Sequence, residues 1–369
     1  MASRLPADAP VLAGFTYVRP LGAGGFADVF LYEQDMPRRP VAVKVLLDKL
    51  EDEGLRHLFA AEADAMARLS AHPSILTIYH AGVSPDGRPY IVMEYCPSSY
   101  ASRYRREAIP VAEALHTGVK IACALESAHR EGLLHRDIKP SNLLITAYDS
   151  PVLSDFGIAA SRAHHDEYEV IAMSVPWSPP EMIDGRTPGT IATEVWGLGA
   201  TIYSLLAGRS PFENPGGSAN SREQLKVRIR RAAYAPIGRD DLPPGVEDVL
   251  RRALSREPGD RQTSAADFAH ALQLVQYEAG MPVTPLELVD ASPAPSTPRS
   301  APNAAALRRT HVPHSSSRRA RTAPVRRMPS DDLDAPQRAG RIPLWAWPVG
   351  GLAVAAVGVV AAVLVAVGN

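Results

Sequence analysis

The stretch that decides the fold is His135-Arg136-Asp137-Ile138-Lys139-Pro140-Ser141-Asn142, a short polar run that follows an apolar, helix-like segment. A second polar motif, Asp155-Phe156-Gly157, begins thirteen residues after its last member. Neither motif decides a function by itself. Their order and spacing, together with motifs farther toward the N-terminus, carry the interpretation.

Toward the N-terminus lies a glycine-rich stretch, Leu21-Gly22-Ala23-Gly24-Gly25-Phe26-Ala27-Asp28-Val29. Glycines let a tight strand–turn–strand bring backbone N–H groups against phosphate oxygens without interference from side chains. Lys44 follows at the end of the apolar run Val-Ala-Val-Lys, where a half-buried ammonium needs an anionic partner. Glu62, in a helix-like segment, can supply that carboxylate, and nucleotide phosphates can supply others.

Hydrophobic periodicity divides residues 15–275 into two parts. The first part contains short apolar runs bounded by polar or turn residues, such as Val41–Val43 and Tyr90–Met93, which are typical of strands. The second part contains Val111–His129, with apolar residues three and four apart, and the strongly apolar Val195–Leu206. A β-rich part followed by an α-rich part predicts an α+β fold with two lobes.

The whole set of motifs resembles the eukaryotic-like protein kinases, and specifically the Ser/Thr kinases of bacteria. The resemblance covers roughly Tyr17 to Leu274. It implies the two-lobed protein kinase fold, with a small β-rich N-lobe over about residues 15–95 and a larger helical C-lobe over about residues 96–275. It also implies ATP as the phosphate donor and Mg²⁺, with Mn²⁺ as an alternative, as the metal.

The resemblance assigns a role to each motif residue. Asp137 would accept the proton of the substrate hydroxyl or orient it, and Lys139 would neutralise charge on the transferred phosphoryl group. Lys44 would hold the α- and β-phosphates and pair with Glu62. The metal would be bound by Asn142 and Asp155, because hard cations prefer oxygen ligands. The adenine would be held by the segment between the lobes, with Met93 behind it: Glu94, Tyr95 and Cys96.

Other positions match parts of the family that hold the site together or select the acceptor. Lys139, two residues after Asp137, follows the Ser/Thr rather than the tyrosine pattern. Ser174 stands where the family has a Ser or Thr that contacts Asp137 and Lys139. The remaining residues are expected to be structural or regulatory: His135, Arg136, Phe156, Gly157, Glu181, Glu194 and Arg261. Of these, Glu181 and Arg261 are expected to form a buried ion pair.

The sequence departs from the family pattern at three positions. Ala27 replaces the third loop glycine, and Pro179 replaces the alanine before Pro-Glu. Glu194 replaces the aspartate that supports the backbone of the catalytic loop, so we expect this support to be weakened or shifted rather than lost.

The segment Ile158–Met173 contains no threonine, and its only serine is Ser161. In the family, an arginine at the position of Arg136 usually meets a phosphate on this segment. One hypothesis is that an acidic side chain replaces that phosphate. The candidates are Asp166, Glu167 and Glu169. The alternative is that these are solvated loop charges.

Charge is segregated along the chain, although the formal net charge is only −1. The first 290 residues carry about −8, which argues against nucleic acid as a partner, whereas residues 291–341 hold ten arginines and three aspartates. We expect residues 276–341 to be a mostly disordered, Pro/Arg/Ser-rich linker drawn to anionic lipid. Residues 1–14 are expected to be a separate N-terminal extension.

The last 28 residues contain no charged side chain. Residues 342–367 are long and apolar enough to be predicted as a single transmembrane helix, leaving residues 368–369 outside. Arginines before this stretch predict a cytoplasmic catalytic domain, and two cysteines agree with a reducing compartment. Glycines at 350, 351 and 358 leave a homodimer open.

The leading interpretation is a membrane-anchored Ser/Thr protein kinase that acts on protein substrates in signalling. One alternative is a pseudokinase scaffold that binds nucleotide without catalysis; the full set of motif residues argues against it. The other is a small-molecule phosphotransferase with the same lobed fold; the Ser174–Glu181 region argues against that.

Overall fold

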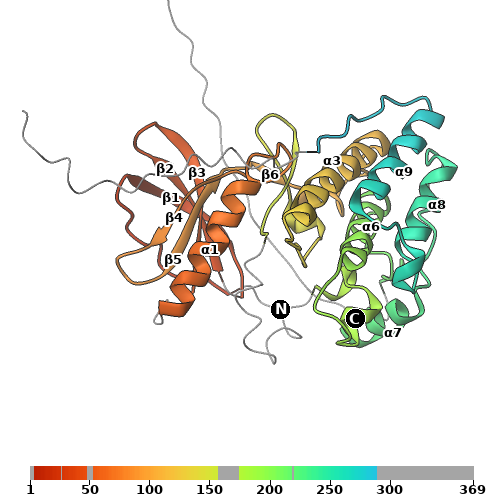
Figure 1. Ribbon diagram of the computed structural model, residues 1–369, viewed down its shortest axis with the longest axis horizontal. Helices are drawn as coiled ribbons and strands as arrows, with labels where there is room; N and C mark the ends of the chain where they lie inside the picture. The colour runs from red at the N-terminus through yellow and green to blue at the C-terminus, as the bar shows by residue number, and fades with distance from the viewer. Residues whose placement is uncertain (1–3, 26, 48–52, 157–173, 218–219, 289–369) are drawn as a thin grey trace, which may run out of the picture. The chain divides into compact units, whose positions relative to one another are not determined.

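The computed structural model describes residues 4–25, 27–47, 53–156, 174–217 and 220–288 (Figure 1). Several predicted parts lie outside these residues: Phe26, the segment 157–173 with Gly157, the linker beyond residue 288 and the expected transmembrane helix. Within the described ranges, no helix is long and apolar enough to cross a membrane. The prediction for residues 342–367 is therefore not tested by the structure.

The first lobe is an antiparallel five-stranded sheet in the order β1-β2-β3-β5-β4, with α1 beside it (Figure 1). Its elements are β1 Phe15–Ala23, β2 Ala27–Gln34, β3 Arg39–Leu46, α1 Glu53–Leu69, β4 Ile78–Val83 and β5 Pro89–Glu94. Alternate residues of β2 and β3 are buried on one face of this sheet, including Phe30, Tyr32 and Val43. This period of two is the pattern of strands with one covered face.

Residues 4–14, within the predicted N-terminal extension, complete that covered face. Leu12 is 5% exposed and packs with Phe30 and Tyr32 in the same apolar cluster. The Tyr32 hydroxyl donates a 2.6 Å hydrogen bond to the carbonyl oxygen of Pro10. The first lobe therefore begins before residue 15, because its sheet needs this segment to cover it.

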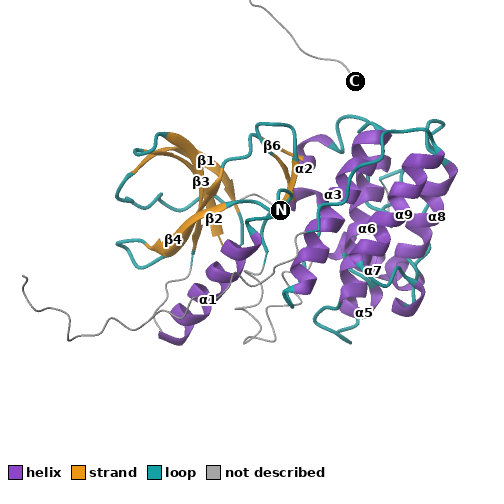
Figure 2. Cartoon of the chain, turned by 45° about the horizontal axis from the view of Figure 1, so that its top comes forward, coloured by secondary structure: helices purple, strands orange, loops and turns teal. Residues whose placement is uncertain are grey.

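The second lobe is built on helices, as the colouring of Figure 2 shows. The larger helices are α3 Val111–Arg130, α6 Ile191–Ala207, α7 Arg222–Arg231, α8 Pro244–Ala253 and α9 Ala265–Glu278. The short elements are β6 Ser98–Ser99, α2 Tyr100–Arg103, η1 Pro140–Asn142, β7 Leu143–Ile145, β8 Pro151–Leu153, η3 Val175–Trp177, α5 Pro180–Ile183 and η4 Pro258–Asp260. Helix α3 packs closely on α9, because a Cβ atom on Gly118 would lie 2.5 Å from Leu272.

Residues 276–288 belong to this lobe, so the ordered part of the chain extends into the linker that was predicted to be mostly disordered. Thr284 is 4% exposed, and it exchanges hydrogen bonds with the side chain of Gln276 in α9. Glu287 pairs with Lys120 of α3, and its carbonyl oxygen lies 2.7 Å from Nε2 of His72. We call residues 279–288 the C-terminal strap. Its bonds to α3 and α9 order a stretch whose composition indicated disorder.

Candidate active site

The polar motifs His135–Asn142 and Asp155–Gly157 are joined by a short hairpin. The 3-10 helix η1 ends at Asn142, and strands β7 and β8 then return the chain to Ser154 and Asp155. The Ser154 N–H donates to the carbonyl oxygen of Asn142 at 2.9 Å, and the Ser154 hydroxyl donates to the same oxygen at 3.1 Å. The hairpin therefore places Asn142 and Asp155 side by side, thirteen residues apart in sequence.

Lys44 reaches this place from β3. Its Nζ lies 2.6 Å from Oδ1 of Asp155, and their side chains are 13% and 38% exposed. Burial works to raise the pKa of the Asp155 carboxyl, but the charge and hydrogen bond of Lys44 outweigh it and hold that pKa below its usual value. Asp155 is therefore ionised at neutral pH. The side chain of Glu62, the expected partner of Lys44, lies outside the described part, so that pairing stays a prediction.

Asp137 lies at the centre of a second group of polar atoms. Its Oδ2 is 2.6 Å from Nζ of Lys139, and the same Nζ donates to the Ser174 hydroxyl at 2.8 Å. The Asn142 amide donates to the carbonyl oxygen of Asp137 at 2.7 Å. The expected contact of Ser174 with Lys139 is thus present, and the carboxylate of Asp137 remains 36% exposed. An exposed carboxylate beside a lysine can receive a hydroxyl group from solution.

Asn142 and Asp155 have the donor atoms that a hard cation requires. The Asn142 nitrogen is committed to Asp137, which leaves its Oδ1 as an oxygen donor. Lys44 is bonded to Oδ1 of Asp155, which leaves Oδ2 as a second donor. Two oxygen donors on adjacent backbone segments fit Mg²⁺, which is bound by few protein carboxylates together with phosphate oxygens and water.

His135 joins the two motifs from the buried side. Its Nδ1 accepts the backbone N–H of Asp137 at 3.2 Å, so Nε2 is the protonated nitrogen and donates to the carbonyl oxygen of Ser154 at 2.7 Å. Its ring also meets Phe156 edge to face, with centroids 4.7 Å apart. His135 is 1% exposed, so it holds the loop and does not face a substrate.

Two non-glycine residues of the site have a left-handed backbone. Arg136 has φ 65° and Asp155 has φ 64°. Such conformations cost on the order of 1 kcal/mol each outside glycine and persist where the surroundings impose them. Here the surroundings are the hydrogen bonds of His135 and Glu194, which fix the backbone on both sides of the site.

The glycine-rich stretch, residues 21–29, forms a hairpin of β1 and β2 next to Lys44. Gly24 N–H donates to the Ala27 carbonyl oxygen at 2.9 Å, and a Cβ on Gly24 would approach that oxygen to 3.1 Å. Val29 pairs with Lys44 across β2 and β3, so both side chains lie on the face that points to Asp155. Asp28 lies on the opposite face. Its side chain therefore points away from Lys44, so a contact of Asp28 with ATP would go through its backbone, and its assignment as an ATP-binding residue stays a prediction.

The segment between the lobes begins where β5 ends. The Glu94 N–H donates to the Thr77 carbonyl oxygen at 2.9 Å, and Arg19 donates to the Tyr95 hydroxyl at 3.4 Å. Burial, aided by the nearby Glu94, raises the pKa of the Cys96 thiol to about 12. Cys96 is thus an unreactive neutral thiol at neutral pH. A small apolar cavity behind this segment is lined by Lys44, Met66, Ile91, Met93 and Phe156, among others.

Residues 15–275 match the family model described as the protein kinase domain. The chain belongs to the protein kinase family. The serine/threonine-protein kinase PknK of Mycobacterium tuberculosis (strain ATCC 25618 / H37Rv) is 40% identical over 279 residues, covering 75% of this chain and 25% of PknK. The serine/threonine-protein kinase PknJ of the same strain is 33% identical, covering 75% and 48%. Mouse Aurora kinase B is 30% identical, covering 69% and 72%. The chain thus spans about a quarter of the length of PknK.

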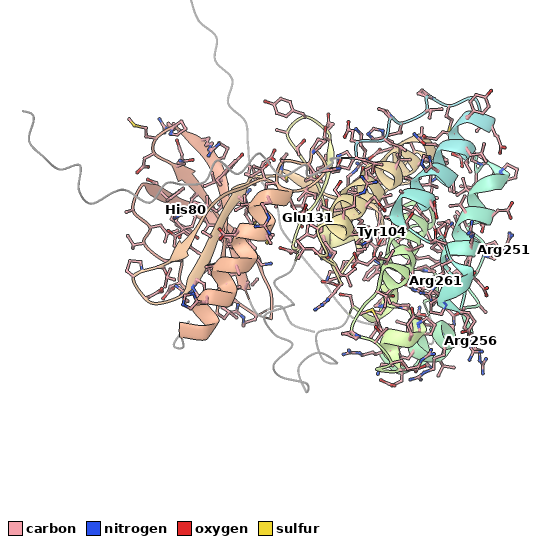
Figure 3. All side chains as sticks on the ribbon, viewed as in Figure 1. His80, Tyr104, Glu131, Arg251, Arg256 and Arg261 are labelled. Carbon is pink, nitrogen blue, oxygen red and sulfur yellow. The ribbon has the colours of Figure 1, made fainter. Side chains whose placement is uncertain are left out.

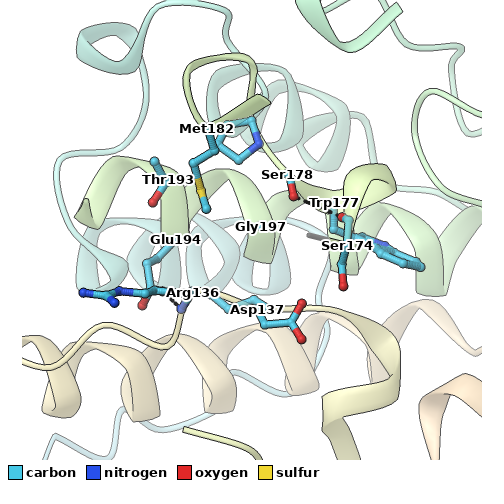
Figure 4. Close-up of a pocket in the computed structure, with 11 residues that line it drawn as sticks. Arg136, Asp137, Ser174, Trp177, Ser178, Met182, Thr193, Glu194 and Gly197 are labelled. Atoms are coloured by element: carbon cyan, nitrogen blue, oxygen red, sulfur yellow. Dashed lines mark hydrogen bonds between the residues drawn. The ribbon is translucent and has the colours of Figure 1, made fainter. Parts of the chain in front are cut away.

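Glu194, one of the departures from the kinase pattern, supports the backbone of Arg136 and also bonds to His129. Figure 4 shows Glu194 extending from α6 to the backbone of Arg136, whose N–H donates to Oε1 at 2.6 Å. Oε2 accepts from Nε2 of His129 at 2.9 Å, and both side chains are at most 3% exposed. Burial works to raise the pKa of Glu194, but the His129 hydrogen bond and the other contacts hold it below its usual value. The support is present, as expected, and His129 is a site residue that the sequence did not predict.

The second departure, Pro179, fits the backbone on which it stands. It has φ −75° and precedes helix α5, where its carbonyl oxygen accepts from Met182. A proline needs φ near −65° and has no N–H to place, so this helix start accommodates it without strain.

Glu181 and Arg261 form the expected buried pair. Two guanidinium nitrogens of Arg261 contact the two carboxylate oxygens of Glu181 at 2.6 and 3.0 Å, and the side chains are 0% and 6% exposed. The other Arg261 hydrogen bonds go to the carbonyl oxygens of Ala192, Ser255 and Arg256. Figure 3 places Arg261 among the helices of the C-lobe, whereas Arg251 and Arg256 lie at its outer edge.

The guanidinium group of Arg136 has one buried nitrogen that could donate a further hydrogen bond. Among the described residues, its Nε is buried and has no hydrogen-bond acceptor. The acidic candidates Asp166, Glu167 and Glu169 lie outside the described residues, so the hypothesis that one of them pairs with Arg136 remains a prediction.

Proposed function

We propose that this chain is an ATP-dependent Ser/Thr protein kinase. The observation that carries the proposal is the position of Lys139 Nζ, 2.6 Å from the Asp137 carboxylate and 2.8 Å from the Ser174 hydroxyl, beside the Asn142–Asp155 pair. A carboxylate, a lysine and two cation-binding oxygens at one place are what transfer of a phosphoryl group to a hydroxyl requires. The similarity to the serine/threonine kinases PknK and PknJ supports this assignment.

Each residue would act by position and charge. Asp137 would accept a hydrogen bond from the acceptor hydroxyl and take up its proton, and Lys139 would offset the charge on the transferring phosphoryl oxygens. Lys44 would hold the phosphates of ATP, and the glycine-rich hairpin would present backbone N–H groups above them. Mg²⁺, when bound by Asn142 and Asp155 with the phosphates, neutralises phosphate charge.

A protein acceptor is favoured by the surroundings of Asp137. Figure 4 shows a small pocket between the loop of residues 135–139 and α6, lined by Ser174, Trp177 and Met182, among others. Its floor is close-packed, because a Cβ on Gly197 would lie 3.3 Å from Ile138. The pocket holds only about 20 Å³, too little to enclose a small-molecule acceptor, so the 36% exposed Asp137 carboxylate suits a hydroxyl on an extended chain better.

The C-terminal sequence supports a membrane anchor as a further part of the proposal. The uncharged residues 342–367 would cross the bilayer, and the arginine-rich linker would attract anionic lipid on the cytoplasmic side, where the kinase domain would act on signalling substrates. The measurement is fractionation of cells expressing the full chain. Full recovery in the soluble fraction would contradict the anchor.

The activity is tested by γ-phosphate transfer from ATP to a generic basic protein in the presence of Mg²⁺. We expect Asp137→Ala to lose transfer by at least about 10²-fold, since it removes the proton acceptor. Asp248→Ala, the same change at an exposed position of α8, is the matched control and should transfer as the wild type does. A wild type that binds ATP but transfers nothing would instead be a pseudokinase scaffold. Transfer to small-molecule hydroxyls alone would indicate a small-molecule phosphotransferase.

A further inference from the structure

A buried carboxylate lies in the glycine-rich hairpin, on the face turned away from the nucleotide. Asp28 is 0% exposed. It pairs with Val45 across β2 and β3, one residue from the Val29–Lys44 pair that faces Asp155. An ionised carboxylate in such a place costs several kcal/mol unless it is paired. Its partners therefore show what the hairpin is attached to.

Those partners come from the N-terminal segment, residues 4–12. The Arg4 guanidinium forms an ion pair with Oδ1 of Asp28. The Ala7 N–H donates to Oδ2 at 2.7 Å. The same Arg4 nitrogen also donates to the carbonyl oxygen of Gly24 at 3.4 Å, within the glycine turn itself. Arg4 thus contacts both the turn and the strand that follows it.

The rest of the N-terminal segment anchors Arg4 to the sheet. Pro10 accepts the buried hydroxyl of Tyr32, and Leu12 is buried beside the same ring. Going back along the segment from Pro10 to Ala7 and Arg4, the contacts move along β2 from Tyr32 to Asp28 and on to Gly24. The segment therefore runs along the strand and ends at the turn.

We propose that Arg4 and Asp28 are positioning residues for ATP: they clamp the glycine-rich turn from the face opposite the phosphates. The inference rests on the proposed kinase function and adds to it how the turn is held. Glycines make this turn flexible, and ordering it costs conformational entropy when phosphate binds. Bonds to Gly24 and Asp28 order the turn in advance, so ATP binding loses less entropy.

A merely structural role for this ion pair makes a different prediction. If Asp28 only stabilises the sheet, its loss lowers the unfolding temperature and leaves the KM for ATP unchanged. If the pair positions the turn, its loss raises the KM for ATP while the KM for the protein acceptor stays the same, because Asp137 and Ser174, beside which the acceptor would lie, belong to the other lobe.

The experiment uses the full chain and steady-state transfer to a basic protein, with MgATP varied. We expect Arg4→Ala and Asp28→Asn each to raise the KM for ATP about three- to tenfold, the range of one ordinary hydrogen bond, because the pair acts on ATP only through the turn. Arg4→Lys should restore much of this loss. The matched control is Arg38→Ala, the same change at an arginine that pairs with Glu33 of β2, away from the turn and outside the N-terminal segment. It should leave the KM for ATP as in the wild type.

A double-variant comparison completes the test. Arg4→Ala combined with Asp28→Asn should raise the KM for ATP no further than the larger single effect, because both changes break one clamp. Unchanged KM values in the folded Arg4→Ala protein, or an equal rise in Arg38→Ala, would overturn the inference while the kinase function stands. A wild type without transfer would overturn both. If Asp28→Asn does not fold, Arg4→Ala and Arg4→Lys decide the result.

Discussion

Two ion pairs, in two regions of the molecule, have the same chemical type and opposite surroundings. Glu181 and Arg261 are at most 6% exposed, and carbonyl oxygens take up the other hydrogen bonds of the guanidinium. Lys44 and Asp155 are 13% and 38% exposed, joined by a single contact that leaves Oδ2 of Asp155 and the other ammonium hydrogens for further partners. A closed, fully bonded pair serves the fold, whereas an open pair with spare donors and acceptors can bind phosphate and metal.

The comparison predicts that breaking the open pair removes function without unfolding the protein. We expect Asp155→Asn to lower phosphate transfer by about 10²- to 10³-fold, because a charged oxygen donor is lost. The free energy of unfolding should change by only about 1 kcal/mol, because Asp155 is 38% exposed and water can reach the pair. Transfer assays and denaturant unfolding measure the two quantities. Near-wild-type transfer by Asp155→Asn would show that the open pair is not the metal site.

Breaking the closed pair should do the reverse. Arg261→Met leaves the Glu181 carboxylate buried without its partner, and we expect a loss of about 3–5 kcal/mol in unfolding free energy. Denaturant unfolding at neutral pH measures it. The double variant Glu181→Gln, Arg261→Met removes the stranded charge and should recover part of the loss. If Arg261→Met were as stable as the wild type, the distinction between the pairs would fail.

Glu194 extends the comparison, because it is a fully buried carboxylate with all its bonds made inside the protein, yet it supports the exposed active site through the backbone of Arg136. Its pKa in the folded protein is lowered, so its contribution to stability is full above the ordinary value of 4.5 and is lost as the pH falls through the folded-state pKa. We expect the stability difference between the wild type and Glu194→Gln to be about 1–3 kcal/mol near pH 7. The difference should shrink below about pH 4.5. Unfolding curves across pH 3–7 measure it, and a difference that does not depend on pH would contradict the assignment.

The smallest change in stability is expected for the partly exposed ion pair of Lys120 and Glu287, which contacts no residue of the phosphate-transfer site. Lys120 and Glu287 are 15% and 34% exposed and join α3 to the C-terminal strap. Glu287→Gln should lower the unfolding free energy by about 0.5–1 kcal/mol and leave the KM for ATP unchanged. A rise in that KM would show that the strap acts on the active site.

The sequence predicted the elements that have a strong period or a fixed motif. The apolar run Val195–Leu206 lies within α6, and Val111–His129 falls within α3 to one residue. The ends of these helices depend on local chemistry: Thr190 caps α6 at its start, and Gly208 ends it with φ 69°. The pairing of Lys139 with Asp137 and Ser174 followed from motif positions, because those motifs fix roles as well as residue types.

The sequence did not predict contacts between segments that have no pattern. Residues 4–12 and 279–288 have neither helical nor strand periodicity, and both are ordered by hydrogen bonds to distant elements. For the linker from residue 276, composition favoured disorder because it counts apolar residues and not buried hydrogen bonds. His129 was missed for a similar reason, since only the extra methylene of Glu194 hinted at a second partner. The burial of Asp28 was not predicted either, because a motif position does not say which face of a strand the side chain takes.

The C-terminal strap also bears on how the enzyme can be produced. A fragment that stops at residue 275 would retain every residue of the phosphate-transfer site, yet it would lose the last turn of α9 and the apolar side chains Leu286 and Leu288, which pack on the main core. The uncovered groove on α3 and α9 would then favour aggregation. If such a fragment self-associated in gel filtration, the cause would be the apolar surface exposed by the truncation and not a native dimer interface. A fragment from residue 4 to residue 288 keeps that surface covered by Leu286 and Leu288.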